Sequence, residues 1–180
     1  PWVVARWPTR AQIPMAILGV IVLVGAWTAL VELQARSPWL VLAAMAIVWI
    51  ADTAAFFAGR RFGRHKLAPA ISPGKSWEGA WGGIAAVAVY AALLVPLASR
   101  AGVNTPVNAS SVVLWIAFAI VLAALSIVGD LHESLLKRRA GVKDSGTLLP
   151  GHGGILDRTD ALLAAMPPVA LATLAFVAPT

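Results

Sequence analysis

The chain has 180 residues, of which 59% are hydrophobic and 12% are charged. A soluble domain carries about 25% charged residues, so this composition and a mean hydropathy of +0.81 exclude a soluble domain and a disordered chain. No cysteine is present, which excludes disulfides, thiolate metal sites and a cysteine nucleophile. We attribute the net charge of +6 to basic loops at a membrane surface and not to nucleic-acid binding.

Apolar stretches of roughly the length that crosses a bilayer follow one another along the chain. They cover residues 13–33, 39–58, 80–98, 112–129 and 161–177. The last stretch is short and contains Pro167 and Pro168, where we expect a kink. The stretches are continuous and not alternating, which argues against spanning strands. The sequence therefore predicts an all-α integral membrane protein, with about five transmembrane helices in one polytopic domain over residues 1–180.

Charged residues gather in two windows, 52–78 and 130–160, which contain every acidic residue except Glu32. With five spans, both windows lie on the same side as the N-terminus. That side holds every Lys and Arg except Arg36 and Arg100, so the positive-inside rule places two long polar loops at the cytoplasmic face. The chain starts at Pro1 without a signal-peptide pattern, and we expect a fragment that lacks further N-terminal spans.

Carboxylates in the two windows suggest a metal site. Asp130 follows one apolar stretch, Asp157 and Asp160 precede another, and Asp52 lies inside a stretch, where a carboxylate is costly. Carboxylates combined with Lys, Arg and glycine-rich turns favour a phosphate site with Mg²⁺, and a pair of carboxylates can hold one or two metal ions for displacement at phosphorus. Two alternatives stay open: a structural ion pair of Asp52 with a nearby arginine, and basic residues that contact lipid head groups.

The run SLLKRRAGVKDSGTLLPGHGGILDRTD, residues 134–160, resembles the C-terminal signature of the phosphatidate cytidylyltransferase, or CDP-diacylglycerol synthase, family. The matching positions are Ser134, Lys137, Arg138, Lys143, Asp144, Pro150, His152, Gly153, Gly154, Asp157, Arg158 and Asp160. Residues 52–79 and the pattern Ser126-x-x-Gly129-Asp130 are also similar to this family, so the resemblance covers residues 45–178. The chain departs from the pattern at Gly74 and Ser76, where members often carry a larger polar residue and Thr.

The resemblance implies an Mg²⁺-dependent reaction in which CTP and phosphatidate give CDP-diacylglycerol and pyrophosphate, and it implies a homodimer. It also implies that Asp130 and Asp157 bind the metal, with room for a second cation. Further catalytic candidates are Lys143, Asp144, Arg158 and Asp160. Candidate substrate-binding residues are Asp52, Ser72, Lys75, Ser76, Lys137, Arg138, His152, Gly153 and Gly154.

The expected location is the plasma membrane of a bacterium, with the site facing the cytoplasm, because CTP is cytosolic and the phosphatidate head group lies at the interface. Three alternatives stay open. The first is a CTP-dependent enzyme that acts on another lipid phosphate, such as an isoprenoid phosphate. The second is a homologue that binds without catalysis. The third is a transporter, which would spread its charges through the depth of the membrane.

Overall fold

The structure is a computed structural model that describes residues 9–100, 108–146 and 154–176. Its elements, in chain order, are α2 (Thr9–Arg36), α3 (Pro38–Phe62), β1 (Lys66–Ala68), β2 (Ser72–Ser76), α4 (Trp77–Arg100), α5 (Ala109–Ala140) and α6 (Leu156–Phe176). In the described part, four helical segments are long and apolar enough to cross a membrane: Ala16–Arg36, Pro38–Phe62, Trp77–Leu97 and Ala109–Ala140. The expected all-α membrane architecture is confirmed.

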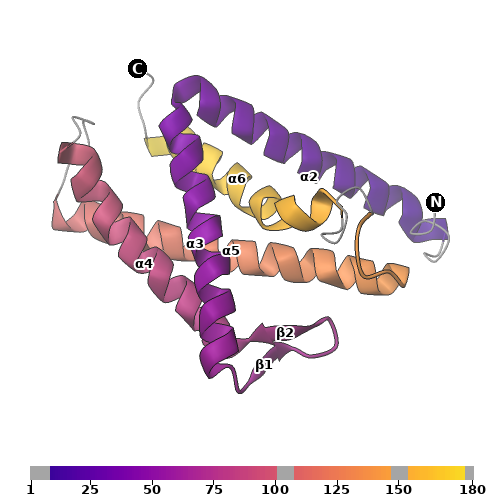
Figure 1. The fold of residues 1–180 in the computed structure, drawn as a ribbon. Coiled ribbons are helices and arrows are strands. Elements are labelled where there is room, and N and C mark those ends of the chain that lie inside the picture. Colours follow the sequence, from indigo (N-terminus) through magenta and orange to yellow (C-terminus); the bar gives the residue numbers. More distant parts are fainter. Residues whose placement is uncertain (1–8, 101–107, 147–153, 177–180) are drawn as a thin grey trace.

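Helix α6 corresponds to the fifth expected span, but it is not among those four segments of the described chain. Its first turns carry Asp157, Arg158 and Asp160, which leave only a short apolar stretch behind them. The helix runs through Pro167 and Pro168 without ending. Figure 1 shows α6 between α2 and α5, and it packs against both.

Local signals in the sequence set the helix ends. The Ser37 Oγ accepts a hydrogen bond from the Trp39 N–H, and Pro38 occupies the first turn of α3. Asn108 caps α5 through a reciprocal pair of hydrogen bonds with Ser111. At the other end of α5, Gly141 adopts a left-handed conformation with φ 71°, which glycine accommodates without strain.

Small residues allow two pairs of helices to approach closely. A Cβ atom at Gly82 of α4 would collide with the Cβ of Ala58 on α3. A Cβ atom at Gly129 of α5 would lie 2.5 Å from the Cβ of Ala164 on α6 and 3.4 Å from the Asp160 carbonyl oxygen. Such contacts between small residues are typical of helix packing in membranes. The close approach at Gly129 brings the acidic residues of α5 and α6 together.

The two polar windows contain more regular structure than the expected long loops. In the first window, α3 continues to Phe62, and the polar connection to α4 contains the antiparallel hairpin β1–β2. In the second window, α5 continues to Ala140, because Leu, Lys, Arg and Ala all favour helix and Gly141 is the first terminating residue. The described loop segments between α5 and α6 are therefore shorter than the 130–160 window.

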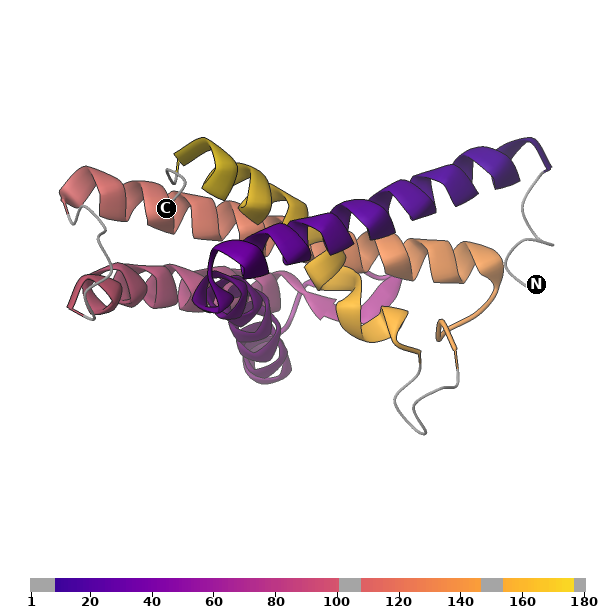
Figure 2. The same ribbon diagram turned by 90° about the horizontal axis from the view of Figure 1, so that it is seen from above.

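The helix packing gathers the polar segments at one end of the molecule. The hairpin extends from the ends of α3 and α4 toward the C-terminal half of α5 (Figures 1 and 2). At the far end of α2, the Arg36 guanidinium donates to the Thr173 carbonyl of α6 over 3.2 Å. Between these ends lies a core of small and aliphatic side chains, with Leu33, Val48, Val87 and Leu122 almost fully buried.

Candidate active site

Charged side chains from α3, β2, α5 and α6 form a continuous network at the polar end of the bundle. Its members are Asp52, Lys75, Asp130, Glu133, Lys137, Asp157 and Asp160. All but Glu133 are residues that the sequence predicts for the site. Carboxylates outnumber ammonium groups in this network, so it carries an excess of negative charge.

The first part of the network joins the hairpin to α5. Lys75 of β2 forms an ion pair with Asp130 of α5, and both side chains are partly exposed. The Ser134 hydroxyl, one turn further along α5, donates to Asp130 Oδ1 over 3.4 Å. Asp52 of α3 interacts electrostatically with Asp130 and Lys75. Three elements that are distant in sequence therefore meet at Asp130.

The second part of the network centres on Lys137. Its Nζ lies 2.6 Å from Glu133 Oε2 on the preceding turn of α5 and 2.6 Å from Asp157 Oδ1 at the start of α6. The three side chains are only 10–16% exposed. Lys137, a candidate for binding phosphate, is thus engaged by two carboxylates that have little access to water.

Asp157 organises the loop that precedes α6. Its carboxylate accepts hydrogen bonds from the Ser145 N–H (2.9 Å), the Ser145 hydroxyl (2.9 Å) and the Gly154 N–H (2.7 Å). Burial raises the pKa of Asp157, but the hydrogen bonds from Lys137, Gly154 and Ser145 outweigh it and hold the pKa well below its usual value. Asp157 therefore stays ionised and ties both ends of the loop to α5.

Asp160 lies one helical turn beyond Asp157, in a less favourable environment for a charge. Burial, reinforced by the negative charges of Asp130 and Glu133, raises the pKa of Asp160 to about 7, although the hydrogen bond from the Ala161 N–H lowers it. A carboxyl group held in this way is poised to lose its proton when a cation approaches.

The network fits a divalent cation by charge. Glu133 is buried; its Oε2 forms the ion pair with Lys137, and its carboxylate also interacts with the carboxyl group of Asp160. Asp130 has one ammonium and one weak hydroxyl donor, whereas Asp157 would have to release a donor to bind a cation. In the described residues, no three Asp, Glu or His side chains are close enough to hold a metal by themselves. Mg²⁺ commonly uses one or two carboxylates and takes its other ligands from phosphate and water.

Other predicted site residues on the hairpin and α5 have structural contacts. Ser76 is buried, and its Oγ accepts a hydrogen bond from the Gly79 N–H at the start of α4. Ser72 is half-buried in β2. Arg138 donates from its Nε to the Ile71 carbonyl at the tip of the hairpin, over 3.2 Å.

The remaining candidates lie on or beside the loop between α5 and α6. Lys143 and Asp144 are exposed and make no ion pair or hydrogen bond with the described residues, so the structure does not bring them into the network. Arg158 is exposed on the first turn of α6, and Gly154 is buried beside Asp157. His152 and Gly153 lie outside the described residues.

Sequence reasoning missed Glu133 and the pair His65–Glu78. Glu133 stands four residues before Lys137, and this spacing on a helix is the signal that could have identified the ion pair. The contact between His65 and Glu78 joins residues thirteen positions apart across the hairpin, and no local pattern predicts it.

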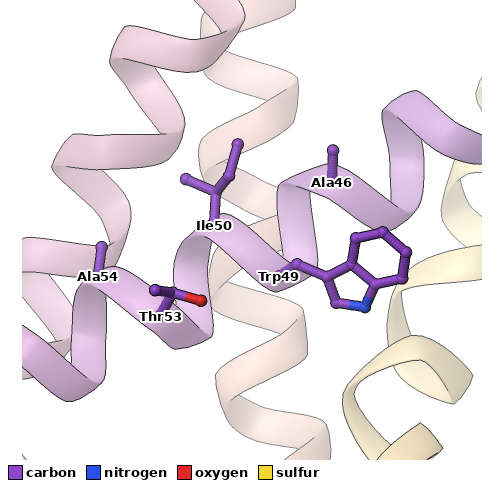
Figure 3. Close-up of a pocket in the computed structure, with 5 residues that line it drawn as sticks. All are labelled: Ala46, Trp49, Ile50, Thr53 and Ala54. Carbon is purple, nitrogen blue, oxygen red and sulfur yellow. The ribbon is translucent and has the colours of Figure 1, made fainter.

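Neither of two surface hollows on the described residues includes a member of the charged network. One open hollow of about 340 Å³ lies on α3 and is lined by Ala46, Trp49, Ile50, Thr53 and Ala54 (Figure 3). It carries no charged group, although Thr53 directly follows Asp52. A second hollow, of about 400 Å³, lies at the end of α3 between Arg61 and Glu78. The charges of the described residues, and not these two hollows, identify the site.

Comparison with known proteins supports the resemblance seen in residues 134–160. The model of the cytidylyltransferase family matches residues 3–176. A protein of Haemophilus influenzae named phosphatidate cytidylyltransferase is 46% identical over 129 residues, which are 72% of this chain and 43% of that protein. Proteins of the same name from Pseudomonas aeruginosa (46% over 152 residues; 83% of this chain, 54% of the relative) and Brucella suis (51% over 122 residues; 67% and 41%) match similarly.

The chain spans about half the length of these curated relatives. The matched region includes the hairpin and the α5–α6 segment that together carry the charged network. The resemblance is confirmed, and the chain belongs to the cytidylyltransferase family.

Proposed function

We propose that the charged network is the site of transfer of the cytidylyl group from CTP to phosphatidate, giving CDP-diacylglycerol and pyrophosphate. Membership of the cytidylyltransferase family and the names of the relatives support this reaction. The single observation that carries the proposal is the convergence of Asp130, Lys75 and Asp160 from three separate elements at one end of the bundle. Charges spread through the depth of the membrane would instead favour a transporter.

In the proposed reaction, an oxygen of the phosphatidate phosphate attacks the α-phosphorus of CTP. The new P–O bond forms as the bond from the α-phosphorus to the bridging oxygen breaks, and pyrophosphate leaves with that electron pair. The attacking oxygen is already anionic near neutral pH, so no strong general base is needed. The work of the protein is then to position two anionic substrates and to offset their repulsion.

The residues of the network divide this work in our proposal. Lys75 is partly exposed beside Asp130 and is the ammonium best placed to turn toward a phosphate. Lys137 is held between Glu133 and Asp157 and fixes the start of α6 against α5. Asp157 holds the loop through Ser145 and Gly154. Ser145 and Gly154, the described residues on either side of this loop, are thereby kept beside the network.

Mg²⁺, when bound, would offset the charge of the phosphates that it contacts. Of the two predicted metal ligands, Asp130 has fewer competing donors than Asp157, and Asp160 and Asp52 lie within electrostatic range of it. We propose Asp130 as the principal ligand, with Asp157 as the second ligand if it releases one of its hydrogen-bond donors.

The membrane location follows from the same proposal. The polar end of the bundle would face the cytoplasm, where CTP is available, and phosphatidate would approach from the adjoining leaflet. Both are consistent with the bacterial relatives and with the basic residues at that end. The homodimer that the resemblance implies stays a prediction, to be measured by the mass of the protein in detergent.

A labelled-CTP assay tests the reaction and the lipid. Purified protein in detergent is given Mg²⁺, CTP labelled at either the α- or the γ-phosphorus, and either phosphatidate or a polyprenyl phosphate. The proposal predicts that the α-label appears in CDP-diacylglycerol with phosphatidate and that the γ-label leaves as pyrophosphate. Transfer of the γ-label to lipid would show a CTP-dependent kinase instead. Transfer only to the polyprenyl phosphate would show a different lipid substrate.

A further inference from the structure

The hairpin that carries Lys75 cannot hold its position by strand pairing alone. It has only two short strands, and an isolated two-stranded hairpin is marginally stable. The register is irregular, because Lys66 pairs with Ser76 while Ala68 pairs with Ser72, which leaves extra residues in β2. These extra residues form a bulge that includes Lys75, and bulges commonly redirect a side chain. Contacts outside the hairpin must therefore keep Lys75 beside Asp130.

One set of contacts holds the base of the hairpin to α4. The Glu78 carboxylate, on the first turn of α4, lies 2.7 Å from His65 Nδ1 and also accepts from the His65 backbone N–H over 3.2 Å. The Trp77 N–H donates to the His65 carbonyl over 3.0 Å. Glu78 is only 25% exposed, although the His65 ring is largely in solvent. The residue that precedes β1 is thus fixed to the helix that follows β2.

The other contact holds the tip of the hairpin to α5. Arg138 Nε donates to the carbonyl oxygen of Ile71, at the turn between β1 and β2, over 3.2 Å. Arg138 lies two turns of helix beyond Asp130 on the same element. The ion pair between Lys75 and Asp130 therefore lies between an anchor at the base, Glu78, and an anchor at the tip, Arg138.

We propose that Glu78 and Arg138 are positioning residues that hold the two ends of the hairpin so that Lys75 meets Asp130. Their catalytic effect, which rests on the proposed function, would pass through Lys75. Arg138 then holds the hairpin and does not contact phosphate, which is the role that the resemblance to the family signature implies for it. The consequences can be measured both in the position of the hairpin and in the coupling between Arg138 and Lys75.

The first test follows the hairpin directly and needs no activity. The chain has no cysteine, so Ala70→Cys at the exposed hairpin turn accepts a single spin label. Electron paramagnetic resonance should show a restrained label in the parent protein and a mobile one in Arg138→Ala and in Glu78→Gln. Arg60→Ala, which removes another exposed arginine at the end of α3, is the matched control and should leave the spectrum unchanged. A label equally restrained in Arg138→Ala and in the parent would overturn the proposal.

The second test measures coupling in the cytidylyl-transfer assay. Arg138→Ala should lower kcat/KM by about tenfold in the parent but by less than about twofold when Lys75→Ala is already present, because residues that act as a unit are not additive. Multiplied losses would mean that Arg138 acts on substrate directly and would overturn the proposal. If the parent shows no transfer, the proposed function fails, and the spin-label result still decides how the hairpin is held.

Discussion

Removal of the ammonium group of Lys137 should strongly destabilise the folded protein. The substitution Lys137→Met keeps most of the apolar stem and removes the charge that lies 2.6 Å from both Glu133 Oε2 and Asp157 Oδ1. The two carboxylates are only 10% and 11% exposed, so water cannot replace the lost ammonium at either of them. The ion pair that the structure gives Glu133 is the one with Lys137, so the substitution removes the positive charge beside it.

The size of the effect follows from this geometry. Breaking a buried ion pair by removing one partner costs about 3–5 kcal/mol, because the other charge is left buried and uncompensated. Asp157 keeps its donors from Ser145 and Gly154, so the larger share of the cost falls on Glu133. The unfolding equilibrium should shift by roughly 100-fold to several thousandfold, at about 1.4 kcal/mol for each factor of ten.

Denaturation by sodium dodecyl sulfate in mixed micelles, followed by the fluorescence of the eight tryptophans, measures this free energy of unfolding. Lys143→Met is the matched control, since Lys143 is exposed and has no partner in the described structure. Adding Glu133→Gln to Lys137→Met should restore part of the stability, because it neutralises the orphaned carboxylate. The reasoning is refuted if Lys137→Met is within about 0.5 kcal/mol of the Lys143 control, the range of ordinary surface substitutions.

Three further predictions concern the same region. Asp157→Asn should preserve the helical circular dichroism but abolish turnover, and near-normal turnover of this variant with saturating Mg²⁺ would contradict the role of Asp157. Arg139→Ala should lower kcat/KM by less than about tenfold. The folded state keeps the proton of Asp160 up to a pKa of about 7, whereas the unfolded state releases it near 3.8. The free energy of unfolding, measured in EDTA, should therefore fall as the pH rises from 3.8 to about 7 and should level off above that. Asp160→Asn should remove this fall. Gly129→Ala should cost about 1–3 kcal/mol in the denaturation assay, because a Cβ there lies 2.5 Å from an α6 side chain, whereas Gly25→Ala meets no atom within 4 Å and should cost nothing.

Hydropathy located four spanning helices and the polar end of the bundle, since an apolar run long enough to cross a bilayer is a property of consecutive residues. The resemblance of residues 134–160 to a family signature likewise predicted that Asp157, Lys137 and Asp160 belong to one site. Both predictions depend only on residues that are close together along the chain, so they can be made from the sequence alone.

The contacts between elements that are far apart in sequence could not be predicted from local patterns. Lys75 meets Asp130 only because a bulged hairpin folds back against α5, and the partners are far apart in sequence. The ion pair of Lys137 with Asp157 depends on how closely α6 approaches α5 at Gly129. Helix α5 continues to Ala140, beyond the end of its apolar stretch at residue 129, because Lys and Arg are good helix formers although they are not apolar.

The proposed role of Asp130 is tested by the dependence of product formation on Mg²⁺, compared between the parent protein and Asp130→Asn. The parent should form CDP-diacylglycerol from CTP and phosphatidate with a saturable requirement for Mg²⁺. Asp130→Asn, which retains the shape of the side chain and loses its charge, should form none at any Mg²⁺ concentration. Full activity of the parent in EDTA, or parent-like activity of Asp130→Asn, would contradict this role.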